Sequence, residues 1–497
     1  MTERQGAYLE MSLSPSGVFL LVAGPHCSLS WALSLLERAP FPGPSVAVLL
    51  EDAHPSLSGL PQLPSGQVDR WVVIGDPLEG LPGDCFPDMV SAATHLELLL
   101  AQGGRVLLAG AAAADLVRYA PTLREALSPA QATVDLDALL RNANRFREAT
   151  GGAAVLPVIK ANAYGLGAPV LGWTLADWGA EGFVVAYPDE GVELRKGGIQ
   201  RPILVQNALE PEVAKLVRNG LEVQVSSVEQ VGWLAEEAAR TGRVVGVHVK
   251  VDTGMSRAGL LPAEAAALAL QVSRTPGLAL AGLMTHLASA DEPAEDGFTQ
   301  TQLQRFEAVR SALSAEGVVP RWVHAANSSG TARFPEAHLD AIRAGIALWG
   351  YASALPLATH PVVRLTTRVV SVKWVEAGET VGYGRTWATG DRPRHIAVVA
   401  IGYYDGYPRA LSNLGWMGVH GTRCPVVGRV CMDVTMIDVT HLGGGVRAGD
   451  EVVVYGAGPD EPDLERLAAL VDTIPYELLT RLSPRIRRIY RRSCPTL

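Results

Sequence analysis

The chain has 497 residues, 48% of them apolar and 6% aromatic, so it is long enough for two or three packed domains. Its formal net charge of −9 comes from dispersed acidic residues with no long basic run, which argues against a nucleic-acid partner. The five cysteines lack metal-type spacing, the apolar run at Val18–Ala23 is far shorter than a membrane span of about 20 residues, and no basic leader precedes it, so cytoplasmic residence is expected.

Residues 1–130 predict a small open α/β domain. Apolar, strand-like runs lie at 18–22, 46–50, 71–74 and 106–109, and a helical pattern covers 87–102. Gly24, Gly75 and Gly110 each follow a strand-like run, but no GxxxxGK[ST] phosphate loop is present, so nucleotide hydrolysis is not expected. The pattern is loosely similar to the C-terminal domain of Mur ligases of the peptidoglycan pathway.

Residues 131–362 alternate strand-like runs with amphipathic helical stretches. The helical stretches include 228–240, 262–274 and 299–315. The strand-like runs number eight and lie at 155–159, 183–186, 203–205, 221–225, 244–251, 278–284, 322–325 and 341–343. Eight strand–helix units predict a TIM barrel.

Residues 363–497 change to strand-like runs separated by glycine-containing turns, which predicts a mostly β domain. These runs lie at 367–375, 396–401, 426–430, 436–439 and 452–455. A helix is expected over 463–479, followed by a basic tail at 485–492 that we expect to be a solvated surface.

Reactive side chains of a parallel barrel come from the carboxyl ends of its strands. Here the runs end on or near Lys160, Lys250, His286, His324 and Arg343, with Asn327, Ser328 and Gly345 close behind. Each alone would more often be a solvated lysine, a structural histidine or a turn residue. Together, an imine-forming lysine, backbone amides suited to a phosphate, an arginine and two histidines describe a pyridoxal-phosphate site.

Seven motifs, spread over about residues 132–490, carry a resemblance to a known family. They occupy 158–165, 251–259, 285–292, 324–328, 343–346, 401–406 and 428–433. This part of the chain resembles bacterial alanine racemases. The resemblance implies a pyridoxal-phosphate TIM barrel, a C-terminal β domain and a head-to-tail homodimer with an amino-acid substrate.

The resemblance also implies a role for each matching residue. Lys160 would be the Schiff-base lysine, and Tyr403, helped by Met432, would be the opposing base, entering from the partner subunit. Lys250 matches a residue that is often carbamylated in this family, which would let it hold Arg257. The other expected cofactor contacts are Tyr164, Arg257, His286, Asn327, Ser328, Arg343, Gly345 and Ile346; Arg257 and Met432 would also contact substrate.

Racemisation explains this choice of residues. The α-proton leaves one face of the substrate and returns to the other, so two bases on opposite faces are needed. A tyrosine, with an ordinary pKa of about 10, needs cationic neighbours to act as a base near neutral pH. An arginine at the pyridine nitrogen donates only, which weakens the electron sink and limits transamination.

Two departures and three alternatives remain. Leu166 stands where a histidine is common in the family, and Pro484 where some members have a phosphate-binding tyrosine. A non-catalytic pyridoxal-phosphate-binding regulator would lack the β domain. A decarboxylase of the same architecture would place a carboxylate where Arg343 stands, although Cys431 could be its β-domain cysteine. A racemase of serine or another amino acid differs by one or two pocket side chains.

Overall fold

The computed structural model describes residues 8–13, 18–23, 27–41, 44–50, 68–74, 84–86, 89–100, 104–109, 129–352 and 354–493. The chain forms two compact units, Ala138–Pro361 and the combination of Met1–Asp137 with Val362–Leu497. Among the described residues, no helix is both long and apolar enough to cross a membrane.

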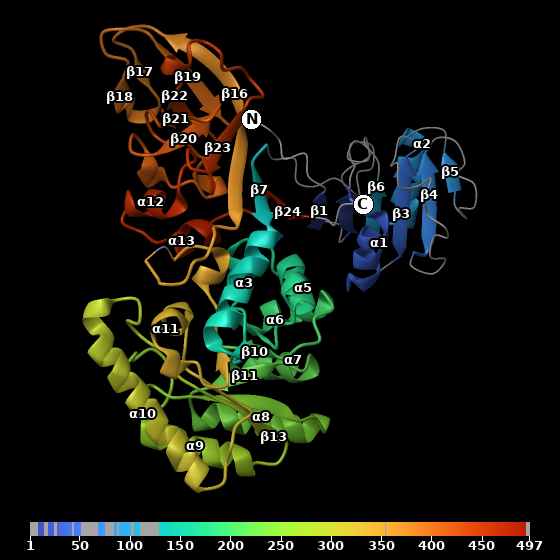
Figure 1. The fold of residues 1–497 in the computed structure, drawn as a ribbon, viewed down its shortest axis with the longest axis vertical. Helices are drawn as coiled ribbons and strands as arrows, with labels where there is room; N and C mark the ends of the chain where they lie inside the picture. The colour runs from blue at the N-terminus through green and yellow to red at the C-terminus, as the bar shows by residue number, and fades with distance from the viewer. Residues whose placement is uncertain are drawn as a thin grey trace. The chain divides into compact units, whose positions relative to one another are not determined.

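The unit Ala138–Pro361 contains a parallel barrel, the green and yellow part of Figure 1. Six parallel strands run in the order β14-β13-β12-β11-β10-β9, and β15 pairs in parallel with β8. The barrel closes through the Val158–Val184 bridge on one side and through Asp340 N–H to Val323 O on the other. The predicted TIM barrel is therefore confirmed. Its strands are β8 (Ala154–Val155), β9 (Phe183–Val185), β10 (Ile203–Val205), β11 (Glu222–Val225), β12 (Val245–Lys250), β13 (Leu278–Met284), β14 (Trp322–His324) and β15 (Ala341–Ile342).

Amphipathic helices accompany these strands. In α8 (Val228–Thr241), Val231, Leu234 and Ala238 are buried at helical spacing. The hydroxyl of Ser227 caps its first turn by accepting the Gln230 N–H, and Gly242 ends it in a left-handed conformation. The other helices are α3 (Leu136–Thr150), α4 (Lys160–Tyr164), α5 (Ala168–Trp178), α6 (Pro188–Lys196), α7 (Val213–Arg218), α9 (Pro262–Arg274), α10 (Asp296–Ala315) and α11 (Ser328–Arg333).

The C-terminal domain is organised around the long strand β16 (Val363–Val375). It pairs antiparallel with β7 (Gln131–Asp135), β19 (Arg394–Val399) and β23 (Glu451–Tyr455). The other longer strands are β20 (Trp416–Val419), β21 (Thr422–Pro425) and β22 (Thr435–Asp438), and two short strands, β17 (Thr380–Val381) and β18 (Trp387–Ala388), form a separate hairpin. The mostly β architecture is as predicted.

Two details of that domain differ from the sequence prediction. The run at 426–430 is not a strand, because Gly428 takes φ +73° and leaves only a bridge between Val426 and Ile437. The helix expected over 463–479 is split into α12 (Leu464–Ala469) and α13 (Pro475–Thr480). Asp472 adopts φ 52° in the break, and Pro475 can only begin a new helix.

The N-terminal region is an α/β layer, as predicted. Its strands follow the order β1-β2-β6-β3-β4-β5, and all neighbours from β2 to β5 are parallel. Gly24, Gly75 and Gly110 lie outside the described residues. The elements are β1 (Tyr8–Leu13), β2 (Val18–Ala23), α1 (Leu29–Arg38), β3 (Ser45–Leu50), β4 (Arg70–Ile74), β5 (Asp84–Phe86), α2 (Met89–Leu99) and β6 (Gly104–Ala109).

The basic tail is not a solvated surface, so that prediction was wrong. It forms β24 (Arg487–Ser493), parallel to β7 on one side and antiparallel to β1 on the other (Figure 1). Ile489 and Tyr490 are buried, and Arg491 pairs with Glu10 of β1 at 2.7 Å. Backbone pairing with β7 and β1 on both sides of β24 explains the burial. One sheet therefore continues from the C-terminal domain into the N-terminal region.

The four cysteines among the described residues fall into two groups. Cys85, Cys424 and Cys431 are free, whereas Cys27 is disulfide-bonded. That bond is unusual for the reducing compartment expected from the cysteine spacing.

Candidate active site

A cavity of about 240 Å³ lies in the barrel unit. It brings together Lys160, Lys250, Arg257 and His286, which were predicted from separate motifs. The other lining residues were not predicted from the sequence; they are Gln206, Asn207, Gln224, Met255 and Ala258. A polar cavity that contains the Arg257 guanidinium suits a ligand with an anionic group.

The segment α4 is a left-handed turn that begins directly after Lys160. Ala161, Asn162, Ala163 and Tyr164 all have φ between 52° and 57°, although none is glycine. Left-handed helix costs an L-residue about 1–2 kcal/mol, so the four together cost on the order of 4–8 kcal/mol. Asn162 helps to hold the turn, since its side-chain oxygen accepts the Ala168 N–H at 2.7 Å. Such strain after a reactive residue is typical of a functional site.

The side chains of Tyr164 and Ser328 converge on Gly345. A Cβ at Gly345 would lie 3.3 Å from the Tyr164 hydroxyl and 3.6 Å from Ser328 Oγ, so the glycine leaves room in front of two hydroxyls. Gly345 N–H donates to Ser328 Oγ at 2.9 Å. Asn327, expected at the cofactor, caps α11 by accepting the Gly330 N–H at 2.8 Å, and Ile346 is buried beside Gly345. This cradle of hydroxyls and a bare backbone fits a phosphate group.

Arg343 is fixed at the end of β15. Its guanidinium donates to the carbonyl oxygens of Thr285 and Ala325 at 2.7 and 2.9 Å. It also contacts His324 Nδ1 at 2.8 Å and His286 Nδ1 at 3.4 Å. Burial lowers the pKa of Arg343 to about 10, which still leaves it protonated at neutral pH. The site therefore presents a rigid, permanently charged donor.

A chain of hydrogen bonds runs from Arg343 across the barrel interior. Because an arginine only donates, His324 Nδ1 must accept, and His324 Nε2 then donates to His248 Nδ1 at 2.9 Å. His248 Nε2 in turn donates to Glu222 at 2.9 Å, and Arg321 donates to the same carboxylate. Burial lowers the pKa of both histidines, so both are neutral at pH 7.

Lys250 lies near the guanidinium groups of Arg343 and Arg257, and only 6% of its surface is exposed. Burial first, and then the charges of Arg343 and Arg257, hold the pKa of its amine well below the ordinary value. The pKa of His286 is lowered in the same way, by burial and then by Arg343. The lowered pKa makes this amine a better nucleophile than that of an ordinary lysine.

Tyr403 and Met432 lie in the other compact unit, on the C-terminal domain. Tyr403 is 43% exposed and Met432 is 53% exposed. The Tyr403 N–H donates to Cys431 O at 2.9 Å, and the Tyr404 N–H to Met432 O at 3.0 Å. Gly402 allows this contact, since a Cβ there would lie 2.3 Å from Met432 O. The structure thus brings both predicted residues onto one exposed surface.

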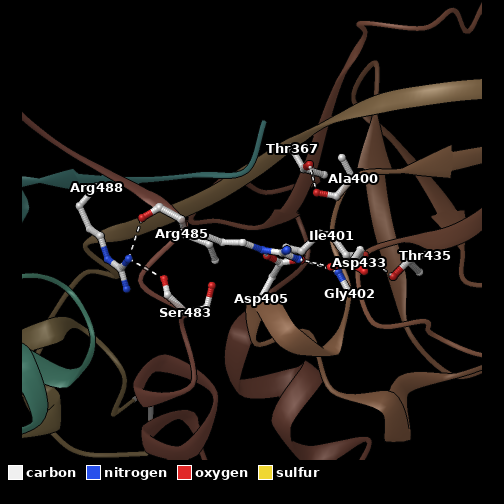
Figure 2. Close-up of polar contacts among 11 residues, drawn as sticks. Thr367, Ala400, Ile401, Gly402, Asp405, Asp433, Thr435, Ser483, Arg485 and Arg488 are labelled. Atoms are coloured by element: carbon white, nitrogen blue, oxygen red, sulfur yellow. Dashed lines mark hydrogen bonds and ion pairs between the residues drawn. The ribbon is translucent and has the colours of Figure 1, made fainter. Parts of the chain in front are cut away.

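An ion-pair cluster anchors the Tyr403 turn (Figure 2). The Asp405 carboxylate, which is 1% exposed, accepts the Gly402 N–H at 2.8 Å and two bonds from Arg485 at 2.5 and 3.0 Å. Arg485 also donates to Asp433 at 2.7 Å, and its guanidinium lies over the Tyr404 ring. Asp433 belongs to the Met432 loop, so Arg485 connects the two loops that carry Tyr403 and Met432.

Both departures from the family pattern take defined positions. Leu166 is fully buried just after the left-handed turn, and Pro484 is exposed beside Arg485. Neither offers a polar side chain to a cofactor.

Sequence reasoning missed His248 and Glu222. The signal was available for His248, because it alternates with Lys250 on β12 and such residues face the same side of a strand. Glu222 carries no comparable signal, since its role depends on a strand neighbour distant in sequence.

The chain matches two family profiles. Residues 134–353 match the alanine racemase N-terminal domain, and residues 362–490 match the alanine racemase C-terminal domain. Alanine racemase from Symbiobacterium thermophilum is 42% identical over 372 residues, which cover 74% of this chain and 98% of the relative. The Geobacter sulfurreducens enzyme is 40% identical over 375 residues, which cover 73% of this chain and 97% of the relative.

Solved structures of alanine racemases are similar as well. That of alanine racemase from D-cycloserine-producing Streptomyces lavendulae has a TM-score of 0.69 at 32% identity, covering 74% of this chain and 98% of the other. That from Bartonella henselae with covalently bound pyridoxal phosphate has a TM-score of 0.65 at 29% identity, covering 73% and 99%.

The barrel, the lysine and arginine at its strand ends and the C-terminal β domain define an enzyme of the racemase class. The matched part of this chain covers 97–98% of each of these three proteins, although it is only 73–74% of this chain. The family profiles begin at residue 134, so the N-terminal α/β region lies outside the matched domains. The chain belongs to the alanine racemase family.

Proposed function

We propose that the protein is a pyridoxal-phosphate-dependent alanine racemase that interconverts L- and D-alanine in the cytoplasm and supplies D-alanine for peptidoglycan. The observation that carries the proposal is the convergence of Lys160, Arg257 and His286 on one cavity in a chain 42% identical to a racemase. Family membership supports the reaction, and the polar cavity supports a small substrate that carries a carboxylate.

The described residues fit pyridoxal phosphate. Lys160 would bind it covalently, and the hydroxyls of Tyr164 and Ser328 would contact its phosphate beside Gly345 and Ile346. The remaining contacts would come from Arg257, His286, Asn327 and Arg343. When bound, this cofactor withdraws electrons from the substrate Cα and makes its proton more acidic.

Two side chains would move that proton. Lys160 Nζ serves one face of Cα and Tyr403 Oη the other, so that one removes a proton and the opposite one returns it. The lowered pKa of Lys160, due to burial and then to Arg257, favours the neutral amine that a base requires. Arg343 offers only N–H donors and keeps its own protons. It would therefore leave the pyridine nitrogen unprotonated, which limits transamination.

We further propose a homodimer with shared sites. Tyr403 and Met432 are both more than two-fifths exposed, as expected of side chains that enter a partner's cavity. In the same site, carbamylation of Lys250 would replace an amine among arginines by an anion that holds Arg257.

The test is incubation of the purified chain with a panel of L-amino acids, followed by chiral chromatography. D-alanine as the main product supports the proposal, whereas D-serine in excess would reassign the substrate and no D-product would refute racemisation.

Tyr403→Phe should keep bound cofactor yet lose roughly 10²- to 10⁴-fold in turnover. Tyr404→Phe is the matched control and should stay active.

A mixing experiment tests the shared site. Inactive Lys160→Ala and Tyr403→Phe chains should regain part of the activity when they form heterodimers, because one of the two sites is then intact. Verified heterodimers without activity would place both bases on one chain.

A further inference from the structure

One carboxylate joins the loops that follow two neighbouring barrel strands. Glu190, on the first turn of α6, accepts the Ala161 N–H on Oε1 at 2.6 Å. Its Oε2 accepts the N–H groups of Ala186 and Tyr187, at 2.6 and 3.2 Å. Glu190 therefore binds three backbone donors, one after β8 and two after β9.

The bond to Ala161 matters because this residue opens the left-handed turn. Two later N–H groups are bound within the chain segment itself, with Ala163 donating to Ile159 O at 2.9 Å and Gly165 to Ala161 O at 2.8 Å. The Ala161 N–H, next to Lys160, is bound instead by Glu190. A turn so costly for non-glycine residues persists only where its surroundings fix it.

We propose that Glu190 is a positioning residue for Lys160, which holds the left-handed turn and so aims the lysine amine into the cavity. The proposal rests on the proposed function in so far as Lys160 is the cofactor lysine. Glu190 itself is absent from the cavity lining, so it acts through the backbone and through its charge.

The charge of Glu190 has a second effect on the same lysine. Arg257, Lys250 and His286 share the cavity with Lys160, and Glu193 lies near Glu190 on α6. Burial and then Arg257 lower the pKa of Lys160, whereas Glu190 raises it. Glu190 thus counteracts the effect of Arg257 on the pKa of Lys160. Without Glu190, the lysine would lose its proton at a lower pH.

The experiment separates these two effects with two variants. Glu190→Gln keeps the length and one acceptor oxygen but loses the charge. Glu190→Asp keeps the charge but is one methylene shorter and cannot reach both loops. Glu181→Gln is the matched control, because Glu181 also accepts a backbone N–H, that of Val155 at 2.9 Å, but does so outside the cavity.

The first readout is the proton affinity of Lys160. The full-length chain is freed of cofactor with hydroxylamine, labelled with acetic anhydride at a series of pH values, and analysed by peptide mass spectrometry. In Glu190→Gln the midpoint for Lys160 labelling should fall by about half a pH unit, because an opposite charge is lost. It should stay near the wild-type value in Glu190→Asp and Glu181→Gln.

The second readout is turnover of L-alanine. Glu190→Asp should lose about 10- to 100-fold in kcat with little change in KM, since a misaimed amine affects the reaction more than binding. A wild-type midpoint in Glu190→Gln together with wild-type kcat in Glu190→Asp would overturn the proposal. A wild-type chain that racemises nothing would instead refute the proposed function, because the labelling midpoint does not depend on it.

Discussion

Replacing Arg485 by methionine tests whether the ion-pair cluster holds the Tyr403 turn. Methionine keeps an apolar stem but removes both bonds to Asp405 and the bond to Asp433. Breaking a buried ion pair on one side costs about 3–5 kcal/mol. Since the Arg485 side chain is 39% exposed and that of Asp433 59%, solvent reduces this to about 2 kcal/mol.

That loss should lower the melting temperature by about 4–8 °C in thermal unfolding followed by circular dichroism. Turnover should fall as well, because Gly402 and Tyr403 lose their fixed neighbour Asp405, while cofactor binding in the barrel unit is retained. Arg481→Met is the control, since its pairing with Glu477 is exposed on both sides and worth less than about 1 kcal/mol. An Arg485→Met protein that melts and turns over like the wild type would refute the reasoning.

Three further outcomes are expected. A chain beginning at Glu125 should keep most racemase activity, because every motif follows Ala132, yet it should aggregate more readily since β24 becomes an edge strand; a soluble, inactive dimer would contradict this. Melting temperature should fall as pH drops from 7 to 5, because His248, His286 and His324 have lowered pKa values in the fold and the unfolded chain takes up protons below about pH 6.5; a flat profile would count against it. Gly402→Ala should abolish turnover through its clash with Met432 O, whereas Gly232→Ala in α8, which meets no neighbouring atom, should raise stability by about 0.5–1 kcal/mol.

The barrel could be predicted because its strands are short apolar runs between amphipathic stretches, a pattern that survives in the sequence. The run at 426–430 has the same composition but fails as a strand, because the φ of Gly428 is set by its approach to Val381 O, 2.6 Å from where a Cβ would lie. The prediction that the basic tail is a solvated surface failed for a different reason. Its arginines suggest solvent, while backbone pairing with β1 and β7 decides its place.

The candidate site divides in the same way. Lys160, His286 and Arg343 were found because each ends an apolar run, and the end of a barrel strand is a defined place. The roles of Glu190 and Arg485 could not be predicted in this way, because only the fold brings their partners near. Glu190 accepts a backbone N–H from 29 residues away, and Arg485 donates to a carboxylate 80 residues away. Charge and composition carry no record of such contacts.

The position of β24 also constrains how the protein assembles during synthesis. β1 is among the first described segments to leave the ribosome and β24 is the last, yet they pair directly, Glu10 beside Arg491. At about 5–20 residues per second, β1 waits tens of seconds for its partner. β7 waits as well, since β24 is its parallel neighbour. Until translation ends, two strand edges stay open to wrong partners, so a chaperone that binds nascent chains should improve the yield of full-length protein more than that of the chain beginning at Glu125.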